Sequence, residues 1–225
     1  MNKDKKNKKG MSKKTKIKLI FVILMLILVA FIIGYFVVGG KNSDDKAKTK
    51  VVDEIKEFNY TVSDSDSKLF KEKFKELKKV LSEKEIDNKK YATLVSELFV
   101  IDFYTLDNKL TKNDVGGVQF VYTKHQADFI DKARDGMYKQ VKNNLDNDRK
   151  QSLPEVDTIE VVSTEEVVPS AIFESEDFKN VTEAEAYEIK LKWTYKNDDK
   201  FQKEATVVVV KDSDKLSVAK LSDGE

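Results

Sequence analysis

The chain has no cysteine, one histidine and only two prolines among its 225 residues. Without cysteine there is no disulfide scaffold, no cysteine-ligated metal or cluster and no cysteine nucleophile. One histidine cannot supply the multi-histidine sites of most zinc and copper enzymes. The composition therefore argues against most catalytic chemistries, and we expect neither a metal nor another cofactor.

Arginine is also scarce, because only Arg134 and Arg149 stand among 41 basic residues. Such a lysine bias is typical of AT-rich genomes, so we expect a low-GC Gram-positive source. The 40 acidic residues almost balance the basic ones, but unevenly along the chain. Residues 1–18 hold nine lysines and one acid and carry +8, which leaves −7 for the other 207 residues. The two parts should therefore face different surroundings.

Residues 19–40, LIFVILMLILVAFIIGYFVVGG, form an uncharged apolar run of 22 residues. As a helix this run would extend about 33 Å, enough to cross the roughly 30 Å of hydrocarbon in a bilayer. A cleaved signal peptide is the alternative. Signal peptides, however, have a shorter apolar core and a small-residue cleavage site, which is missing before Gly39. We therefore predict an uncleaved transmembrane helix.

Lysines flank this run unequally, with nine in the 18 residues before it and five in the 18 after it. The more positive flank stays inside, so we predict a basic cytoplasmic tail and an extracytoplasmic part from residue 41 onward, with the reverse topology as the alternative. A nucleic-acid-binding arm is another interpretation of the tail. Topology and attraction to anionic headgroups explain it better, and the negative charge of the rest argues against direct nucleic-acid binding.

Residues 41–50 contain no apolar residue larger than alanine and should form a solvated linker. The remaining residues, 51–225, are enough for one domain with its own core. Its first segment, residues 51–62, alternates apolar and polar residues towards its end, which predicts a strand or an extended arm.

Three segments then carry apolar residues at helical intervals. The first, about residues 66–84, is apolar on one face only. The second, residues 89–107, is apolar over a much wider arc and should be the most buried helix. A turn-rich loop over 107–117 ends in Gly116-Gly117, where a sharp reversal fits. The third helix, over 124–144, follows a capping-box spacing.

After residue 150 the apolar period changes from 3.6 to 2. Residues 187–195 alternate most clearly and predict a strand with one apolar and one wet face. Further strands are predicted over 156–168, 201–210 and 216–221, with a hairpin loop at 197–200. Because helices precede an antiparallel meander, the predicted fold class is α+β.

This order of elements resembles the NTF2-like fold, in which about three helices pack on a curved antiparallel sheet. With the basic tail and one membrane helix in front, the layout over residues 17–222 looks like the VirB8 family of conjugative type IV secretion components, including Gram-positive counterparts. The resemblance implies an assembly scaffold without catalysis. Other NTF2-like domains are isomerases, dehydratases or ligand binders, and fold alone does not choose between these functions.

Four residues are candidates for lining a ligand cavity between helices and sheet: Trp193, Tyr187, Phe103 and Asp102. Aromatic residues at strand spacing are more often simply core, and this is the favoured interpretation. Asp102 is the best catalytic candidate, because NTF2-like isomerases use a buried carboxylate with a raised pKa, although an Asp at the wet edge of a helix is the plainer reading. His125 is the one side chain of a type that commonly serves as an acid or base near neutral pH, but an exposed position in the first turn of the predicted helix is the favoured interpretation.

The resulting hypothesis is a single-pass membrane protein whose external domain docks other envelope proteins or a second copy of itself. Conjugation, secretion or another envelope assembly is the expected setting. A small-ligand-binding module at the cell surface is the alternative hypothesis. An acid/base enzyme using Asp102 and His125 comes third, and we predict no catalytic and no metal-binding residue.

Overall fold

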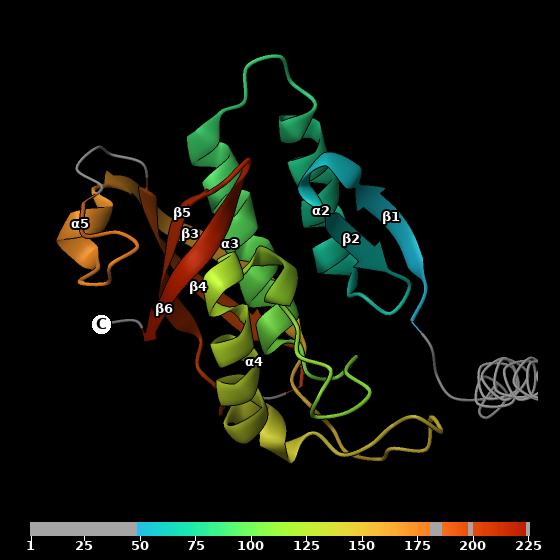
Figure 1. The fold of residues 1–225 in the computed structure, drawn as a ribbon. Coiled ribbons are helices and arrows are strands. Elements are labelled where there is room, and N and C mark those ends of the chain that lie inside the picture. Colours follow the sequence, from blue (N-terminus) through green and yellow to red (C-terminus); the bar gives the residue numbers. More distant parts are fainter. Residues whose placement is uncertain (1–48, 181–185, 198–199, 224–225) are drawn as a thin grey trace, which may run out of the picture. The chain divides into compact units, whose positions relative to one another are not determined.

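The computed structural model describes residues 49–180, 186–197 and 200–223. The predicted basic tail, transmembrane helix and most of the linker lie outside the described residues, as does the middle of the hairpin loop at 198–199. Within the described ranges, no helix is long and apolar enough to cross a membrane. The fold class is α+β, as predicted, with helices packed on an antiparallel sheet (Figure 1).

The first segment is a hairpin and not a single strand or arm. Strand β1 (Val51–Ile55) and strand β2 (Tyr60–Ser63) pair antiparallel. The short 3-10 helix η1 (Lys56–Phe58) joins them and ends at Asn59, whose φ is 54°. Asparagine accepts this left-handed conformation more readily than most residues, and it reverses the chain here.

The first two predicted helices are confirmed as α2 (Lys68–Leu81) and α3 (Asn88–Tyr104). Each begins at a side-chain cap: Ser67 accepts the Phe70 N–H at 3.1 Å, and Asp87 accepts the Lys90 N–H at 3.0 Å. Most of α3 is buried, as its wide apolar arc predicted, because it packs between α2 and the sheet (Figure 1).

The third predicted helix, over 124–144, is wrong in extent. Helix α4 spans only Gln126–Asp135, between the 3-10 helices η3 (Thr123–His125) and η4 (Met137–Gln140), and a further 3-10 turn, η2 (Val118–Phe120), precedes them. The backbone at Gly136 has φ −96° and ψ −114°, outside the helical region, so α4 stops there. The expected capping box does not form, since Thr123 donates from its N–H and hydroxyl to Asp212 instead.

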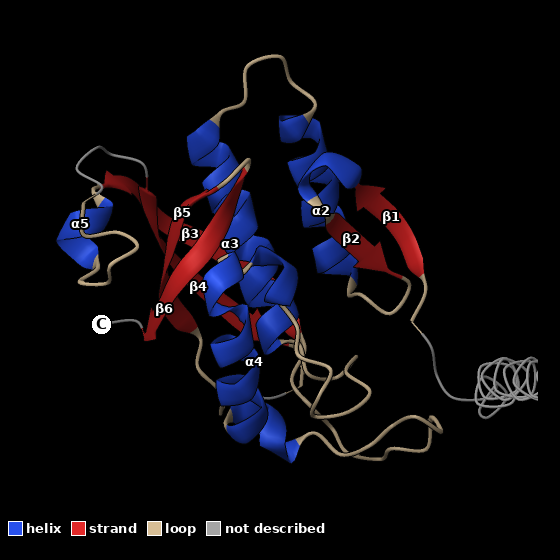
Figure 2. Cartoon of the chain, viewed as in Figure 1, coloured by secondary structure: helices blue, strands red, loops and turns tan. Residues whose placement is uncertain are grey.

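Four strands form the main antiparallel sheet in chain order, which confirms the predicted meander (Figure 2). These are β3 (Val156–Val167), β4 (Ala186–Tyr195), β5 (Glu204–Asp212) and β6 (Lys215–Asp223). A short helix that the pattern did not predict, α5 (Pro169–Ile172), follows β3.

The two faces of this sheet bury different clusters. Ile189, Leu191 and Trp193 of β4 face the main core under α3. The other face carries a smaller cluster, in which the segment after α5 covers β4 and β5. Its buried residues are Tyr122, Phe178, Ala186, Val208 and Val210. Elsewhere on that face polar side chains prevail, among them Glu188, Lys190 and Thr206, with Val162 exposed beside them.

Candidate functional site

Trp193 and Phe103, two of the four proposed cavity residues, belong to the packed core. Trp193 is 3% exposed, and its ring lies 4.7 Å from that of Tyr104 on α3. Phe103 is 8% exposed and stacks on Phe99 at 5.7 Å, while Phe129 of α4 lies 5.1 Å from it. The space between helices and sheet at these two residues is therefore occupied by aromatic side chains.

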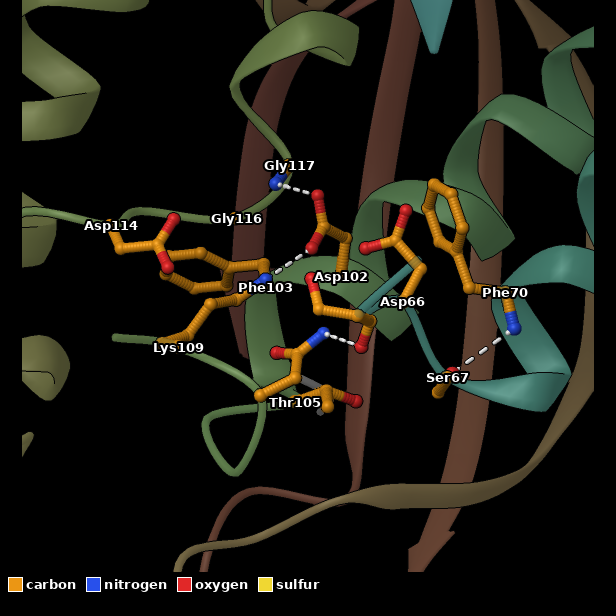
Figure 3. A network of polar contacts seen from close by, with 12 residues as sticks. Asp66, Ser67, Phe70, Asp102, Phe103, Thr105, Lys109, Asp114, Gly116 and Gly117 are labelled. Carbon is orange, nitrogen blue, oxygen red and sulfur yellow. Dashed lines mark hydrogen bonds and ion pairs between the residues drawn. The ribbon is translucent and has the colours of Figure 1, made fainter. Parts of the chain in front are cut away.

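Asp102 lies at the other side of α3, in a polar network with Lys109 (Figure 3). The Lys109 ammonium lies 2.5 Å from one carboxylate oxygen, and the Gly117 N–H donates to the other at 2.6 Å. The side chain of Lys109 is only 6% exposed and that of Asp102 13%. Burial favours the neutral amine, but the ion pair with Asp102 outweighs it and raises the pKa of Lys109.

A small polar cavity of about 160 Å³ adjoins this pair. Asp66 and Asp114 approach it from two other segments (Figure 3). Burial raises the pKa of Asp66, and the neighbouring Asp102 adds to the rise, against the Ser63 N–H that donates to it at 2.7 Å. Within the described part of the chain, no three histidine or carboxylate groups are placed to hold a metal ion. The Lys109 ammonium itself supplies the positive charge here.

The backbone of Gly116 and Gly117 fits tightly around this network. A Cβ on Gly116 would lie 2.2 Å from the carbonyl oxygen of Asp102, and Gly117 has a φ of +79°. Tyr138, which is fully buried, accepts the Gly116 N–H at 3.0 Å and donates to the Phe103 carbonyl at 2.7 Å. These hydrogen bonds hold the loop after α3 against the end of that helix, so their role is structural.

Arg149 also holds this loop, through hydrogen bonds to main-chain carbonyl oxygens. Its guanidinium donates to the carbonyl oxygens of Asp107 at 2.6 Å, Lys109 at 2.7 Å and Lys142 at 3.2 Å. Two long connections, one after α3 and one before β3, are thus joined through main-chain carbonyls. These bonds satisfy main-chain carbonyl oxygens that lie outside the helices and the sheet.

Tyr187, the fourth proposed cavity residue, lies apart from the other three. It is half-buried at the beginning of β4 and lines a cavity of about 420 Å³ together with Phe58, Tyr91 and Lys215. The four predicted residues therefore do not share one cavity. Asp102 and Tyr187 line separate cavities, whereas Trp193 and Phe103 are core.

His125 lies at the start of α4, with its ring 5.1 Å from that of Tyr122 in an edge-to-face contact. It borders a groove between α4 and β6 with Asp128 and Lys132. Asp102 lines a different cavity, so these two residues do not form an acid/base pair at one site.

Lys109 and Tyr138 are the network residues that sequence reasoning missed. Lys109 lies in the turn-rich stretch DNKLTKND, where a lysine reads as solvated, and Tyr138 lies in a predicted amphipathic helix. The one signal was the glycine pair, which indicated a tightly bent backbone without saying what it would surround.

No protein-family model, no curated protein and no solved structure matches this chain.

Proposed function

We propose that this chain is a single-pass membrane protein whose extracytoplasmic domain is an interaction or scaffold module of an envelope assembly, such as one for conjugation or secretion. The observation that carries the proposal is the charge change around the apolar run of residues 19–40. The 18 residues before the run carry +8, whereas the chain from residue 19 onward carries −7.

The arrangement of the described domain supports this proposal. Helices α2 and α3 precede the meander β3–β6, an order that agrees with the NTF2-like layout and, with the basic tail and apolar run, with VirB8-like proteins. We propose that the domain has this architecture. Its interior at Trp193 and Phe103 is filled with side chains, which favours a docking module over a cone that encloses a ligand.

The positions of the ionisable residues favour a non-enzymatic role. Both oxygens of Asp102 are engaged, one by Lys109 and one by the Gly117 N–H. His125 contacts an aromatic ring on another part of the domain. An acid/base enzyme needs such groups in mutual reach of one substrate position.

Topology is testable with single cysteines, because the chain has none of its own. Ser12→Cys marks the tail and Lys139→Cys marks an exposed position of the domain. A membrane-impermeant maleimide should label Lys139→Cys in intact cells and Ser12→Cys only after lysis. Labelling of Ser12→Cys but not of Lys139→Cys in intact cells would contradict the proposed orientation. As the control, both variants should be labelled after lysis.

The scaffold role is tested by association. The full chain in mild detergent should scatter light as a dimer or larger species, or should form a cross-linked complex in cells with a defined partner. A chain that stays monomeric at every concentration, and yields only the single-chain band after cross-linking in cells, would rule out the scaffold role while leaving the topology result intact.

A further inference from the structure

A cavity of about 420 Å³ opens at the end of the main sheet where β4 begins and the β5–β6 hairpin turns. Its walls come from five separate parts of the domain: η1, the α2–α3 connection, the start of α3, the start of β4 and the β5–β6 turn. Its lining combines aromatic and aliphatic side chains with at least as much polar surface, and concave sites that offer both kinds of group are where small ligands bind.

Aromatic rings form one side of this cavity. Phe58 lies edge-to-face with Tyr91 at 5.8 Å and stacks on Tyr60 at 6.2 Å. The Tyr91 hydroxyl is held by the hydroxyl of Tyr60 at 2.9 Å and by the Leu216 N–H at 3.2 Å. These rings are therefore fixed in place before any ligand arrives, and the half-buried Tyr187 adds another ring to the lining.

Lysines stand at the rim without carboxylate partners. Lys215 is half-buried, and its ammonium lies 5.5 Å from the centre of the Tyr60 ring and 3.3 Å from the Gln119 carbonyl oxygen. Asp212, the acid whose charge acts on Lys215, is engaged by the N–H and hydroxyl of Thr123 at 3.0 and 2.8 Å. Burial lowers the pKa of Lys215, with Asp212 opposing. In the described ranges the contacts of the Lys215 ammonium are the Gln119 carbonyl oxygen and the Tyr60 ring, and it forms no ion pair.

The local charge balance favours an anion, though by one charge only. Lys211 also lines the cavity and, among the described residues, forms no ion pair either. Asp214 is the single carboxylate in the lining. A buried or half-buried ammonium without a counter-ion is costly, and a ligand carboxylate would offset that cost.

We propose that this cavity binds a small monoanion with a flat apolar body, of the aromatic carboxylate class, with its ring against Tyr187 and Phe58 and its carboxylate at Lys215. This inference goes beyond the proposed scaffold role and does not depend on it. It also moves the ligand site from the packed interior of the domain to one end of the sheet.

The test uses the full chain in lipid nanodiscs, with sodium benzoate as the probe and saturation-transfer NMR as the readout. Benzamide has the same ring without the charge, and acetate has the charge without the ring. Benzoate should bind about tenfold more tightly than either, because charge-assisted hydrogen bonding and ring burial each contribute. Empty nanodiscs supply the blank for partition into lipid.

Two variants locate the site. Lys215→Gln should weaken benzoate binding about tenfold, down to the level of benzamide, and Tyr187→Ala should weaken both ring compounds. Lys139→Gln, at an exposed position away from this cavity, is the matched control and should change nothing. Emission from the single tryptophan, Trp193 in the core, verifies that each variant is folded.

Equal binding of benzoate and benzamide would overturn the proposal, as would benzoate binding that survives both Lys215→Gln and Tyr187→Ala. Absence of saturation transfer to the wild-type chain would overturn it as well. If the Lys215 variant does not fold, Lys211→Gln replaces it, since its side chain is exposed and also lines the cavity.

Discussion

Asp102 and Lys109 form an ion pair that is almost wholly shielded from water. Removing one of the two charges should therefore cost more stability than removing both. Lys109→Met leaves the buried Asp102 charge without a counter-ion, with only the Gly117 N–H still donating to it. We expect a loss of about 3–5 kcal/mol in the free energy of unfolding. Urea unfolding of the full chain in mild detergent measures this loss, with the exposed Lys139→Met as the control.

The double variant Lys109→Met/Asp102→Asn tests the cause of that loss. It removes both charges and keeps an oxygen that accepts the Gly117 N–H. It should therefore be more stable than Lys109→Met alone. If the double variant were the less stable of the two, the unpaired charge would not be the reason.

Tyr138 satisfies two buried main-chain groups with one hydroxyl. Tyr138→Phe leaves the Phe103 carbonyl and the Gly116 N–H without a partner, so we expect a loss of about 2 kcal/mol. Tyr104→Phe is the comparison, because its hydroxyl donates to the side chain of Gln202 and its loss leaves no main-chain group without a partner. Equal losses in unfolding experiments would argue against the proposed role of Tyr138.

Residue-level prediction from the sequence succeeded unevenly. Aromatic residues at strand or helix spacing were recognisable as core or wall candidates, since burial follows from periodicity. The partner of Asp102 was not recognisable. Lys109 follows it by seven residues across a chain reversal, and a pairing made by loop geometry leaves no periodic signal.

At the level of elements, the contact between α2 and α3 includes one buried acid. Glu97 of α3 is 4% exposed and lies 2.9 Å from the ammonium of Lys73 on α2. Burial raises the pKa of Glu97 above its ordinary 4.5, with Lys73 opposing and Glu76 adding to the rise. The folded chain thus keeps this proton at pH values where the unfolded chain has lost it.

The sign of the pH dependence follows from this linkage. The free energy of unfolding should fall as the pH rises from about 4.5 through the raised pKa of Glu97, because the unfolded state releases the proton first. Glu97→Gln has no proton to release at this position. Its stability relative to the wild type should therefore increase over that range, and parallel pH curves in urea unfolding would contradict this.

Elements with a clear period were predicted best. Strand β4 was predicted within a residue, and α3 was recognised from its wide apolar arc. The third helix was predicted too long because Gly136 interrupts a pattern that continues through Met137 and Val141. Those two residues still pack on the core, but from a 3-10 turn and the residue after it, and side-chain spacing alone does not distinguish the two helix types.

For the whole molecule, the single tryptophan is a built-in reporter of folding. Trp193 is buried between β4 and α3, so it should emit at short wavelength and resist acrylamide quenching in the folded chain. We expect tryptophan emission and far-ultraviolet circular dichroism to follow one unfolding transition for the domain, because the helices and the sheet share the main core. Separate midpoints would show that the helices and the sheet unfold independently.

The contacts of Arg149 limit which substitutions this position accepts during evolution. Lysine fills 39 of the 41 basic positions, so neutral substitution between the two residues runs towards lysine. At Arg134, whose partner is the surface residue Asp131, that exchange should be silent. At position 149 a single ammonium cannot span three carbonyl oxygens as the planar guanidinium does. In urea unfolding, Arg149→Lys should lose most of the stability that Arg149→Ala loses. Position 149 would then have to remain arginine, whereas position 134 could change to lysine without loss.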